Sequence, residues 1–320
     1  MAQSLDFYEE QSFLGQLFYE KIGEEQITAE FPLVNIRIRV HCTPRQDQHL
    51  SHATSSILWA GAQLLGSYLS EENNRCYFTG NAVVELGAGL GIPGILTAKI
   101  GAGVACLTDA DDSEDYMKTM TLNLQENLER HENQKISDCF FKKLVWSDKN
   151  TDLPQLDDIF DHKEQYCQLL RKLPLLILAS DVIYFHTNVI AFTNTIAFYL
   201  NNALSLLLET NSDNVEFITN TDNLPRAIIY NFIPRFVHAA EQFFNNFAQN
   251  GIQISSIWVE DSIDEQSKED KTQKLRIPLN IEDGKLKDCL NKPQFTNKYI
   301  GMIVQPDNSK TLHYSLNKKK

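Results

Sequence analysis

Several features are missing from this chain of 320 residues, and each absence narrows its function. No run of about 18 or more consecutive apolar residues occurs, so the sequence predicts no membrane-spanning helix. The first residues lack a basic region followed by an apolar stretch, so we expect no secretory signal. The six cysteines form no C-x-x-C pair, which favours reduced thiols in a cytosolic or nuclear protein and supports no zinc site.

Basic residues are also scarce. The chain has 29 Lys and Arg against 42 Asp and Glu, a net charge of −13. Because nucleic-acid binding needs a basic face, we expect no direct nucleic-acid partner. An acidic surface can attract a basic protein partner, but it also serves solubility alone. Hydrophobic residues make up 42% and aromatic residues 10% of the chain, enough for the core of one large domain or two small ones.

The strongest motif lies at residues 82–94, AVVELGAGLGIPG, which read as a buried strand, a glycine loop and the start of a helix. Gly87, Gly89 and Gly91 allow a sharp turn and the close approach of a ligand. Pro93 suits the first turn of a helix, where its missing N–H is not needed. The N-terminus of a helix therefore faces the ligand of the loop, as in the first turn of a nucleotide-type α/β domain.

Two cofactor classes compete for this loop. The dinucleotide fingerprint G-x-G-x-x-G is met only by Gly89, Gly91 and Gly94, two residues later than the end of the strand favours. Glu85, two residues before the first glycine, would repel a pyrophosphate. Its carboxylate suits a cofactor with positive charge and no phosphate, such as S-adenosylmethionine with its sulfonium and ammonium groups. A glycine-rich turn without a ligand is the remaining alternative.

Two stretches resemble motifs of a known family. Residues 82–94 resemble motif I of the seven-β-strand (class I) S-adenosylmethionine-dependent methyltransferases. Residues 178–184, LASDVIY, resemble the Asp-x-x-Tyr signature of their methyltransferase-like protein lysine methyltransferase group, with Asp181 and Tyr184 in the key positions. The resemblance covers about residues 57–260. It implies an α/β fold: a doubly wound, mostly parallel, seven-stranded sheet with helices on both faces, Rossmann-like, preceded here by an N-terminal extension.

The resemblance also assigns roles to aromatic residues. Trp59, on a helix predicted for residues 51–70, matches a Trp that covers the cofactor, although Ala60 stands where the family usually has Pro. Trp146 matches a Trp next to the adenine, which an aromatic ring can stack upon. Packing in the core is the alternative for both rings. The predicted cofactor-binding residues are Trp59, Glu85, Gly87, Ala88, Gly89, Gly91, Asp109, Trp146 and Ser180.

Asp109 ends a strand predicted for residues 104–109, about 20 residues after the glycines. In such folds an acid at this place accepts both hydroxyls of the adenosine ribose. Asp111 and Asp112 follow closely, so the sequence leaves open which acid binds the ribose. Acids here also favour the N-terminus of the next helix, which is the structural alternative.

Asp181 and Tyr184 are the predicted catalytic residues. Asp181 follows an apolar strand at residues 175–179, at the edge where open α/β sheets bind ligands. A buried carboxylate there is costly unless a partner compensates it. Attack on a methyl group needs a neutral amine, whereas a lysine with a pKa of about 10.4 is mostly charged at pH 7. We predict that Asp181 orients the lysine amine and that Tyr184 forms a wall of the pocket. A cap at the strand end is the structural alternative.

The remaining elements complete the predicted organisation. An N-terminal extension at residues 1–50 carries a helix and a strand at 33–40; a methyltransferase domain at 51–306 contains a charged insertion at about 260–297; and a flexible tail follows at 307–320. We predict further strands at residues 139–146, 215–220, 252–259 and 299–304, the last of them antiparallel, and helices at about 117–130, 189–208 and 227–247, with a loop at 149–165. Asn123 and Asn127 echo an Asn-x-x-x-Asn pattern of the family.

The sequence therefore predicts an S-adenosylmethionine-dependent methyltransferase that modifies a lysine of a protein substrate. We expect a monomer in the cytoplasm, with the nucleus as a second location. Another acceptor stays open: arginine, for which pockets usually offer two carboxylates, histidine or a small molecule. A methyltransferase-like binding protein without turnover is a further alternative, against which the intact glycine loop and Asp181 count. A dehydrogenase is the alternative with the least support in the sequence.

Overall fold

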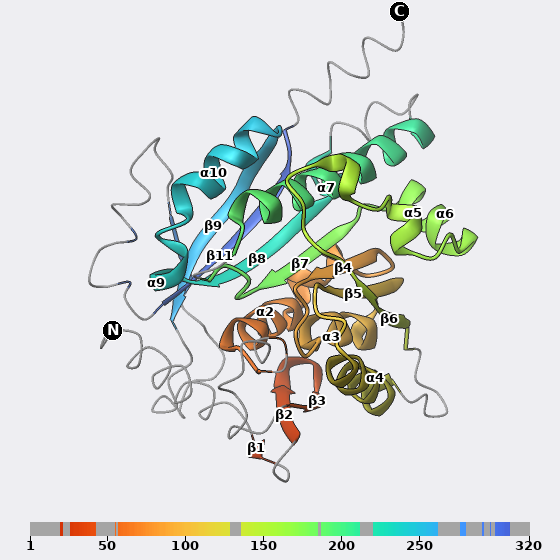
Figure 1. Ribbon diagram of the computed structural model, residues 1–320, viewed down its shortest axis with the longest axis vertical. Helices are drawn as coiled ribbons and strands as arrows, with labels where there is room; N and C mark the ends of the chain where they lie inside the picture. Colours follow the sequence, from red (N-terminus) through yellow and green to blue (C-terminus); the bar gives the residue numbers. More distant parts are fainter. Residues whose placement is uncertain are drawn as a thin grey trace, which may run out of the picture.

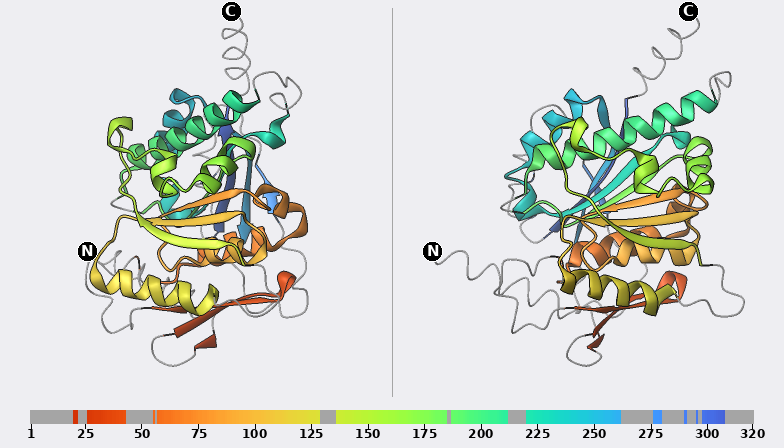
Figure 2. Two further views of the ribbon diagram at one scale, coloured as in Figure 1. Left: turned by 90° about the vertical axis from the view of Figure 1, so that its right-hand side faces the viewer. Right: turned by 45° about the vertical axis from the view of Figure 1, so that its right-hand side comes forward.

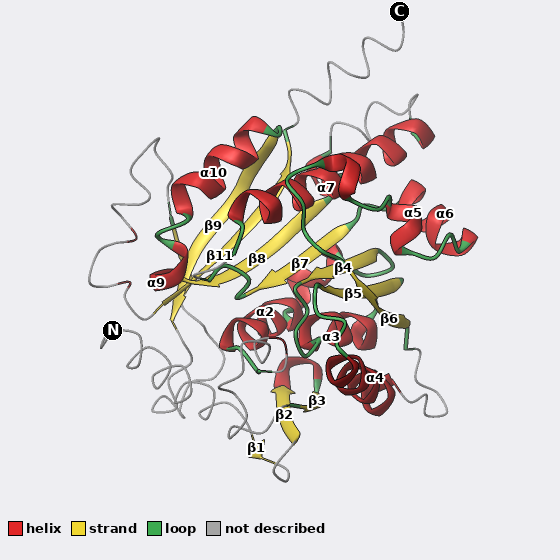
Figure 3. Ribbon diagram, in the orientation of Figure 1, coloured by secondary structure: helices red, strands yellow, loops and turns green. Residues whose placement is uncertain are grey.

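A central sheet organises the molecule (Figure 1). The computed structural model describes residues 20–21, 26–42, 55, 57–128, 136–184, 187–211, 220–261, 276–279, 290, 295 and 298–307. The sheet has eight strands in the order β10-β9-β11-β8-β7-β4-β5-β6. Strands form the middle layer and helices cover both faces (Figures 2 and 3). This confirms the predicted fold class, with the short strand β10 in addition.

The elements have the following bounds. The strands of the central sheet are β4 (Ala82–Leu86), β5 (Val104–Asp109), β6 (Asp138–Lys143), β7 (Leu176–Ser180), β8 (Arg226–Phe232), β9 (Ile252–Asp261), β10 (Arg276–Pro278) and β11 (Lys298–Pro306). The helices are α2 (Ala60–Ser70), α3 (Ile92–Ile100), α4 (Glu114–Leu128), α5 (Leu156–Ile159), α6 (Glu164–Lys172), α7 (Val189–Thr210), α9 (Ile233–Phe236) and α10 (Ala240–Gln249).

The middle of the sheet is parallel. β4 pairs in parallel with β5 and with β7, and β7 pairs in parallel with β8. All residues of β4 and β8 are buried, as expected of strands covered on both faces. Because parallel strands end at the same edge, the sheet brings Leu86, Asp109, Ser180 and Phe232 to its carboxyl edge.

The last strand enters the sheet rather than extending it. β11 is antiparallel to both β8 and β9 and lies between them. The prediction of an antiparallel final strand at residues 299–304 is therefore confirmed. β10, which lies within the range 260–297, adds an edge strand antiparallel to β9.

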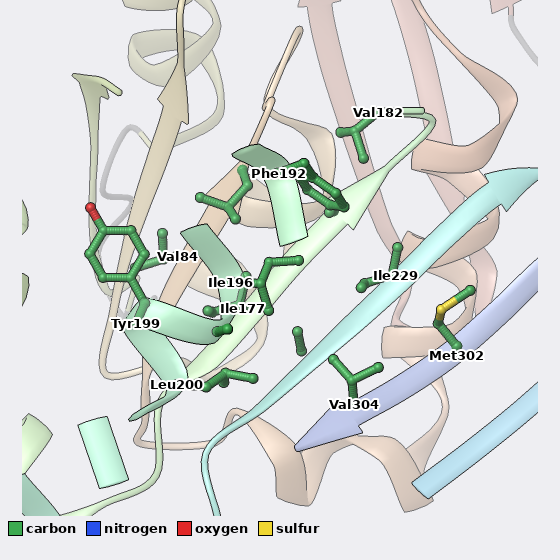
Figure 4. Packing of buried hydrophobic residues seen from close by; sticks show 14 of the residues in the cluster. Val84, Ile177, Val182, Phe192, Ile196, Tyr199, Leu200, Ile229, Met302 and Val304 are labelled. Atoms are coloured by element: carbon green, nitrogen blue, oxygen red, sulfur yellow. The ribbon is translucent and has the colours of Figure 1, made fainter. Parts of the chain in front are cut away.

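A stripe of large apolar side chains on α7 fills one face of the core. Phe192, Ile196 and Leu200 recur at every fourth residue and are fully buried. Figure 4 shows them in one buried cluster with Ile177 of β7 and Ile229 of β8. By length and composition α7 could cross a membrane, but 61% of its most apolar window is buried inside the fold, as in the core helix of a globular domain.

The opposite face carries α2 and α3, and beyond them a small three-stranded antiparallel sheet (Figure 2). Its strands are β1 (Glu20–Lys21), β2 (Gln26–Phe31) and β3 (Ile36–His41). Asn127 of α4 bonds the backbone of β3, accepting from Arg39 N at 3.0 Å and donating to its carbonyl at 2.6 Å. Asn123 accepts from His41 N at 2.6 Å. The Asn-x-x-x-Asn pattern thus docks this sheet on α4.

Some predicted elements are wrong or displaced. Residues 226–232 form β8, although we predict a helix from 227; the run Ala-Ile-Ile-Tyr is the fully buried type that periodicity cannot separate from a helix. The predicted strand at 215–220 lies outside the described residues except for its last residue. Residues 149–165, predicted as a loop, include α5 and the start of α6. The helix predicted for residues 51–70 begins only at Ala60, so Trp59 precedes α2 and has an extended backbone. The predicted helix before residue 19 lies outside the described residues.

Candidate functional site

The glycine loop joins β4 to α3 at the carboxyl edge of the sheet. Gly87, Gly89 and Gly91 have φ angles of +65°, +51° and +79°, which side-chain-bearing residues rarely adopt. A Cβ at Gly87 would lie 2.9 Å from Val182 Cγ1 and 3.1 Å from Trp146 Cζ2. The loop therefore has both reasons for glycine, a left-handed backbone and close neighbours, and it forms a cradle of backbone groups.

Glu85 is a buried carboxyl beneath this loop. It is 1% exposed, and its Oε2 accepts a hydrogen bond from Gly94 N at 2.8 Å, in the first turn of α3. Burial raises the pKa of Glu85 to about 8, and the charge of Asp109 adds to the rise. Within the described ranges no basic side chain forms an ion pair with it. Glu85 is thus an acid that would be ionised most readily beside a positive ligand.

Asp109, the first of three neighbouring acids, binds the glycine loop. Its Oδ2 accepts from Gly89 N at 3.0 Å. Asp111 accepts from Ser113 N at 2.9 Å, just before α4, and from Ser55 Oγ at 2.7 Å, and Asp112 forms an exposed ion pair with Lys143. The assignment of the ribose to Asp109 stays a prediction.

Tyr116 is a residue of this site that the sequence analysis missed. It is 2% exposed, and its hydroxyl donates to the Gly89 carbonyl at 2.9 Å. Its place, as an aromatic residue in the first turn of the helix after Asp109, is the one feature of the sequence that could have indicated this role. Together Asp109 and Tyr116 bond the amide and the carbonyl of Gly89 and so fix the orientation of the loop.

Two further predicted residues lie at the loop. Trp146 packs on Phe192, with ring centroids 4.9 Å apart, and faces the position of Gly87. The strand predicted to end at Trp146 ends three residues earlier, at Lys143, so the ring sits on a connecting segment. Ala88 is buried and donates to the Thr108 carbonyl at 2.9 Å. Ser180 ends β7, next to Asp181.

Asp181 has a fully buried side chain and a left-handed backbone, with φ +53°. Its Oδ2 accepts from Gly61 N at 2.7 Å, and its Oδ1 accepts from Phe232 N at 3.2 Å. A Cβ at Gly61 would lie 2.4 Å from Oδ2, so the carboxylate reaches this amide only because residue 61 is glycine. Burial raises the pKa of Asp181, while the charge of Arg235 lowers it.

Arg235 of α9 compensates the Asp181 carboxylate and was not found from the sequence. Its Nη2 lies 2.7 Å from Asp181 Oδ1, in an ion pair whose side chains are 7% and 0% exposed. Its guanidinium carbon lies 4.9 Å from the centre of the Trp59 ring and 5.5 Å from that of Phe232. A helix predicted across residues 227–247 hides the signal, because Arg235 then falls on a helix surface instead of just beyond a strand.

Tyr184 lies apart from these contacts on the solvent side. It is 41% exposed, and its backbone N–H donates to Thr187 Oγ1 at 3.0 Å. Val182, between Asp181 and Tyr184, faces the position of Gly87. The segment after β7 therefore adjoins the glycine loop, with the buried Asp181 carboxylate at one end and the partly exposed Tyr184 at the other.

Metal binding and disulfides find no support in the described part of the chain. Within those ranges no group of three or more His, Cys, Asp or Glu side chains could hold a metal ion. Cys76, Cys106, Cys139 and Cys167 are free thiols.

Comparison with known proteins gives consistent matches. Residues 45–221, more than half of the chain, match the model of a lysine methyltransferase family. Protein N-lysine methyltransferase METTL21A of Danio rerio is 32% identical over 40% of this chain and 52% of its own length. The METTL21A of Mus musculus is 31% identical over 43% and 55%. The chain thus spans about half the length of these curated relatives.

More distant proteins extend the comparison. The protein N-terminal and lysine N-methyltransferase EFM7 of Cryptococcus neoformans var. neoformans serotype D is 26% identical over 61% of this chain and 58% of its own. Among solved structures, the ribosomal protein L11 methylase of Lactobacillus delbrueckii subsp. bulgaricus covers 77% of each chain at 15% identity, with a TM-score of 0.33. That structural similarity is too low to carry an argument.

Proposed function

Because the chain belongs to the lysine methyltransferase family, we propose that it transfers a methyl group from S-adenosylmethionine to a lysine side chain of a protein substrate. The observation that carries the proposal is Glu85, a buried acid beside a glycine cradle with no ion-pair partner in the described part of the chain. Such an acid favours a cationic ligand and disfavours a pyrophosphate. This argues for a sulfonium cofactor over a dinucleotide.

The residues around the loop fit this cofactor, which supplies an activated methyl group on a positively charged sulfur. In the proposal Glu85 attracts its positive charge, and Gly87, Ala88, Gly89 and Gly91 form the cradle. Asp109 accepts the ribose hydroxyls, which its place on the loop supports. The cofactor-binding set is completed by the flanking residues Trp146, beside the adenine, Ser180 and Trp59.

The substrate side of the proposal concerns the amine. Asp181 orients it, and Tyr184, which is 41% exposed, forms the outer wall of the pocket. A carboxylate offers about four acceptor positions, and three donors already occupy Asp181. One acceptor position is left for the amine. Because the ion pair with Arg235 cancels the charge of Asp181, the amine can lose its proton more easily than beside an isolated carboxylate.

The net charge of −13 supports a basic segment of a protein as the partner, and we propose a monomeric enzyme. The free thiols of Cys76, Cys106, Cys139 and Cys167 support a cytoplasmic location, with the nucleus as a second one.

Calorimetric titration with S-adenosylmethionine, and with NADH in parallel, tests the cofactor. We expect binding of the first at micromolar concentration, on the order of −8 kcal/mol, and none of the second. Gly89→Arg should abolish binding, because Gly89 has φ +51° and Ser55 O would lie 3.3 Å from its Cβ. A methylation assay on cell extract follows, with Asp181→Asn expected to lose turnover. A chain that binds NADH instead would refute the proposal.

A further inference from the structure

Arg235 is bound on three sides, and each contact comes from a different part of the chain. Asp181 follows β7, Phe232 ends β8, and Trp59 precedes α2. The Arg235 guanidinium pairs with the Asp181 carboxylate at 2.7 Å and lies over the Trp59 ring at 4.9 Å. Cation–π contacts of desolvated guanidinium groups are among the stronger ones. The guanidinium is therefore held by charge and by an aromatic face together.

The segment that carries Trp59 is fixed at both ends. At its start Ser55 Oγ donates to Asp111 at 2.7 Å, and Ser55 O faces the position of Gly89 in the glycine loop. At its end Gly61 N donates to Asp181 Oδ2 at 2.7 Å. Residues 57–61 thus run from the glycine loop to the buried ion pair. Trp59 lies between these anchors.

Arg235 lies in a short helical turn directly after a strand of the central sheet. β8 ends at Phe232 and the single turn α9 follows with Pro234, whose ring fixes its φ angle. The Arg235 Nε is buried and has no hydrogen-bond partner within the described ranges. A lysine at this position would keep the charge but would lose the planar face that lies over the Trp59 ring.

We propose that Arg235 is a positioning residue for cofactor binding: anchored on Asp181, it braces the Trp59 ring, which lies on the segment that faces the glycine loop through Ser55. It acts through Trp59 and does not touch the cofactor itself. The identity of the cofactor rests on the proposed function. The loss of one cation–π contact corresponds to a change in affinity of about tenfold.

A mutant cycle on cofactor affinity tests this role. The variants are Arg235→Lys, Trp59→Leu and their combination, and calorimetry measures the dissociation constant for S-adenosylmethionine. We expect each single variant to weaken binding about tenfold. The double variant should bind about as tightly as the single variant with the lower affinity, with no further loss. Hydrogen–deuterium exchange of residues 57–61 without cofactor should be faster in Arg235→Lys, a change that needs no ligand.

Two further variants serve as a control and as an alternative test. Arg37→Lys alters an exposed ion pair with Glu30 on the small sheet and should change neither reading. If Arg235→Lys does not fold, the combination Arg235→Met with Asp181→Asn removes both buried charges and should show the same loss of affinity. Wild-type affinity and exchange in the Arg235 variants, or losses that multiply to about a hundredfold in the cycle, overturn the role of Arg235. A wild-type chain that does not bind S-adenosylmethionine overturns the proposed function as well.

Discussion

Two buried acids lie near the ends of neighbouring strands, and they differ in the partners that the fold gives their carboxylates. Glu85 of β4 receives one backbone hydrogen bond, and burial raises its pKa to about 8. Asp181, just beyond β7, receives two backbone hydrogen bonds and an arginine. Both side chains are almost completely removed from water.

The difference shows where each acid finds its positive charge. Asp181 has an internal cation, the Arg235 guanidinium. Glu85 has no ion-pair partner among the described residues, so its negative form becomes favourable only when a cationic ligand arrives. A buried acid without a cation is costly to stability, and a binding site accounts for its presence.

Glu85→Gln should change the pH dependence of stability most. As pH rises above 4.5 an unfolded Glu85 loses its proton, whereas the folded group keeps it until about pH 8, so the free energy of unfolding falls across this window. The full difference amounts to about 5 kcal/mol at most. The glutamine side chain of the variant stays neutral and escapes this loss. Denaturant unfolding without cofactor should find the variant more stable than wild type at pH 8 and nearly equal at pH 5.

A gap between the two proteins that stays the same from pH 5 to pH 8 would contradict this account of Glu85. Asn127→Ala is a matched control, since it removes a buried polar group remote from both acids. Its cost of about 1–3 kcal/mol should not vary across this pH range.

Arg235→Gln should destabilise the protein by about 3–5 kcal/mol, because it leaves the Asp181 carboxylate buried without its cation. Adding Asp181→Asn should recover most of this loss, since the second change removes the unpaired charge. Thermal unfolding of the four proteins in the cycle measures both values. Additive losses in the double variant would show that the two side chains act independently.

The affinity for S-adenosylmethionine should depend on pH to a smaller extent. A positive ligand beside Glu85 favours its ionised form, so binding releases a proton below pH 8. We expect affinity to rise by at most about tenfold per pH unit between pH 6 and 8 and then to level off. Calorimetry in buffers of different ionisation enthalpy measures the number of protons released on binding. Equal affinity at pH 6 and pH 8 would mean that Glu85 does not face the positive charge.

Much of the fold can be predicted because local signals and tertiary structure agree. The strand, glycine loop and helix of residues 82–94 are found where the residues indicate, and β5 has the predicted bounds. β8 could not be predicted with the same pattern, since a run of buried apolar residues has no period. The mistake also conceals Arg235, whose importance depends on where β8 ends.

The site shows the same limit. Residue types and spacing identify Glu85, Asp109 and the glycines, because these contacts lie within one strand–loop–helix unit and its neighbour. The bonds of Asp181 to Gly61 and to Arg235 join residues 120 and 54 positions apart. No local pattern encodes such contacts, and only the assembled sheet brings them together.

The position of β11 also has a consequence for the time at which the fold can form. The ribosome completes β8 and β9 before it reaches Lys298, the first residue of β11. In the finished sheet β11 pairs with one edge of β8 and with one edge of β9. Until then the nascent chain exposes two unpaired strand edges, which invite pairing with other chains. The part of the sheet that is made first, with its strands paired in the order β7-β4-β5-β6, can assemble earlier. Protection of the half-made sheet by chaperones is therefore most needed between the synthesis of β9 and the emergence of β11.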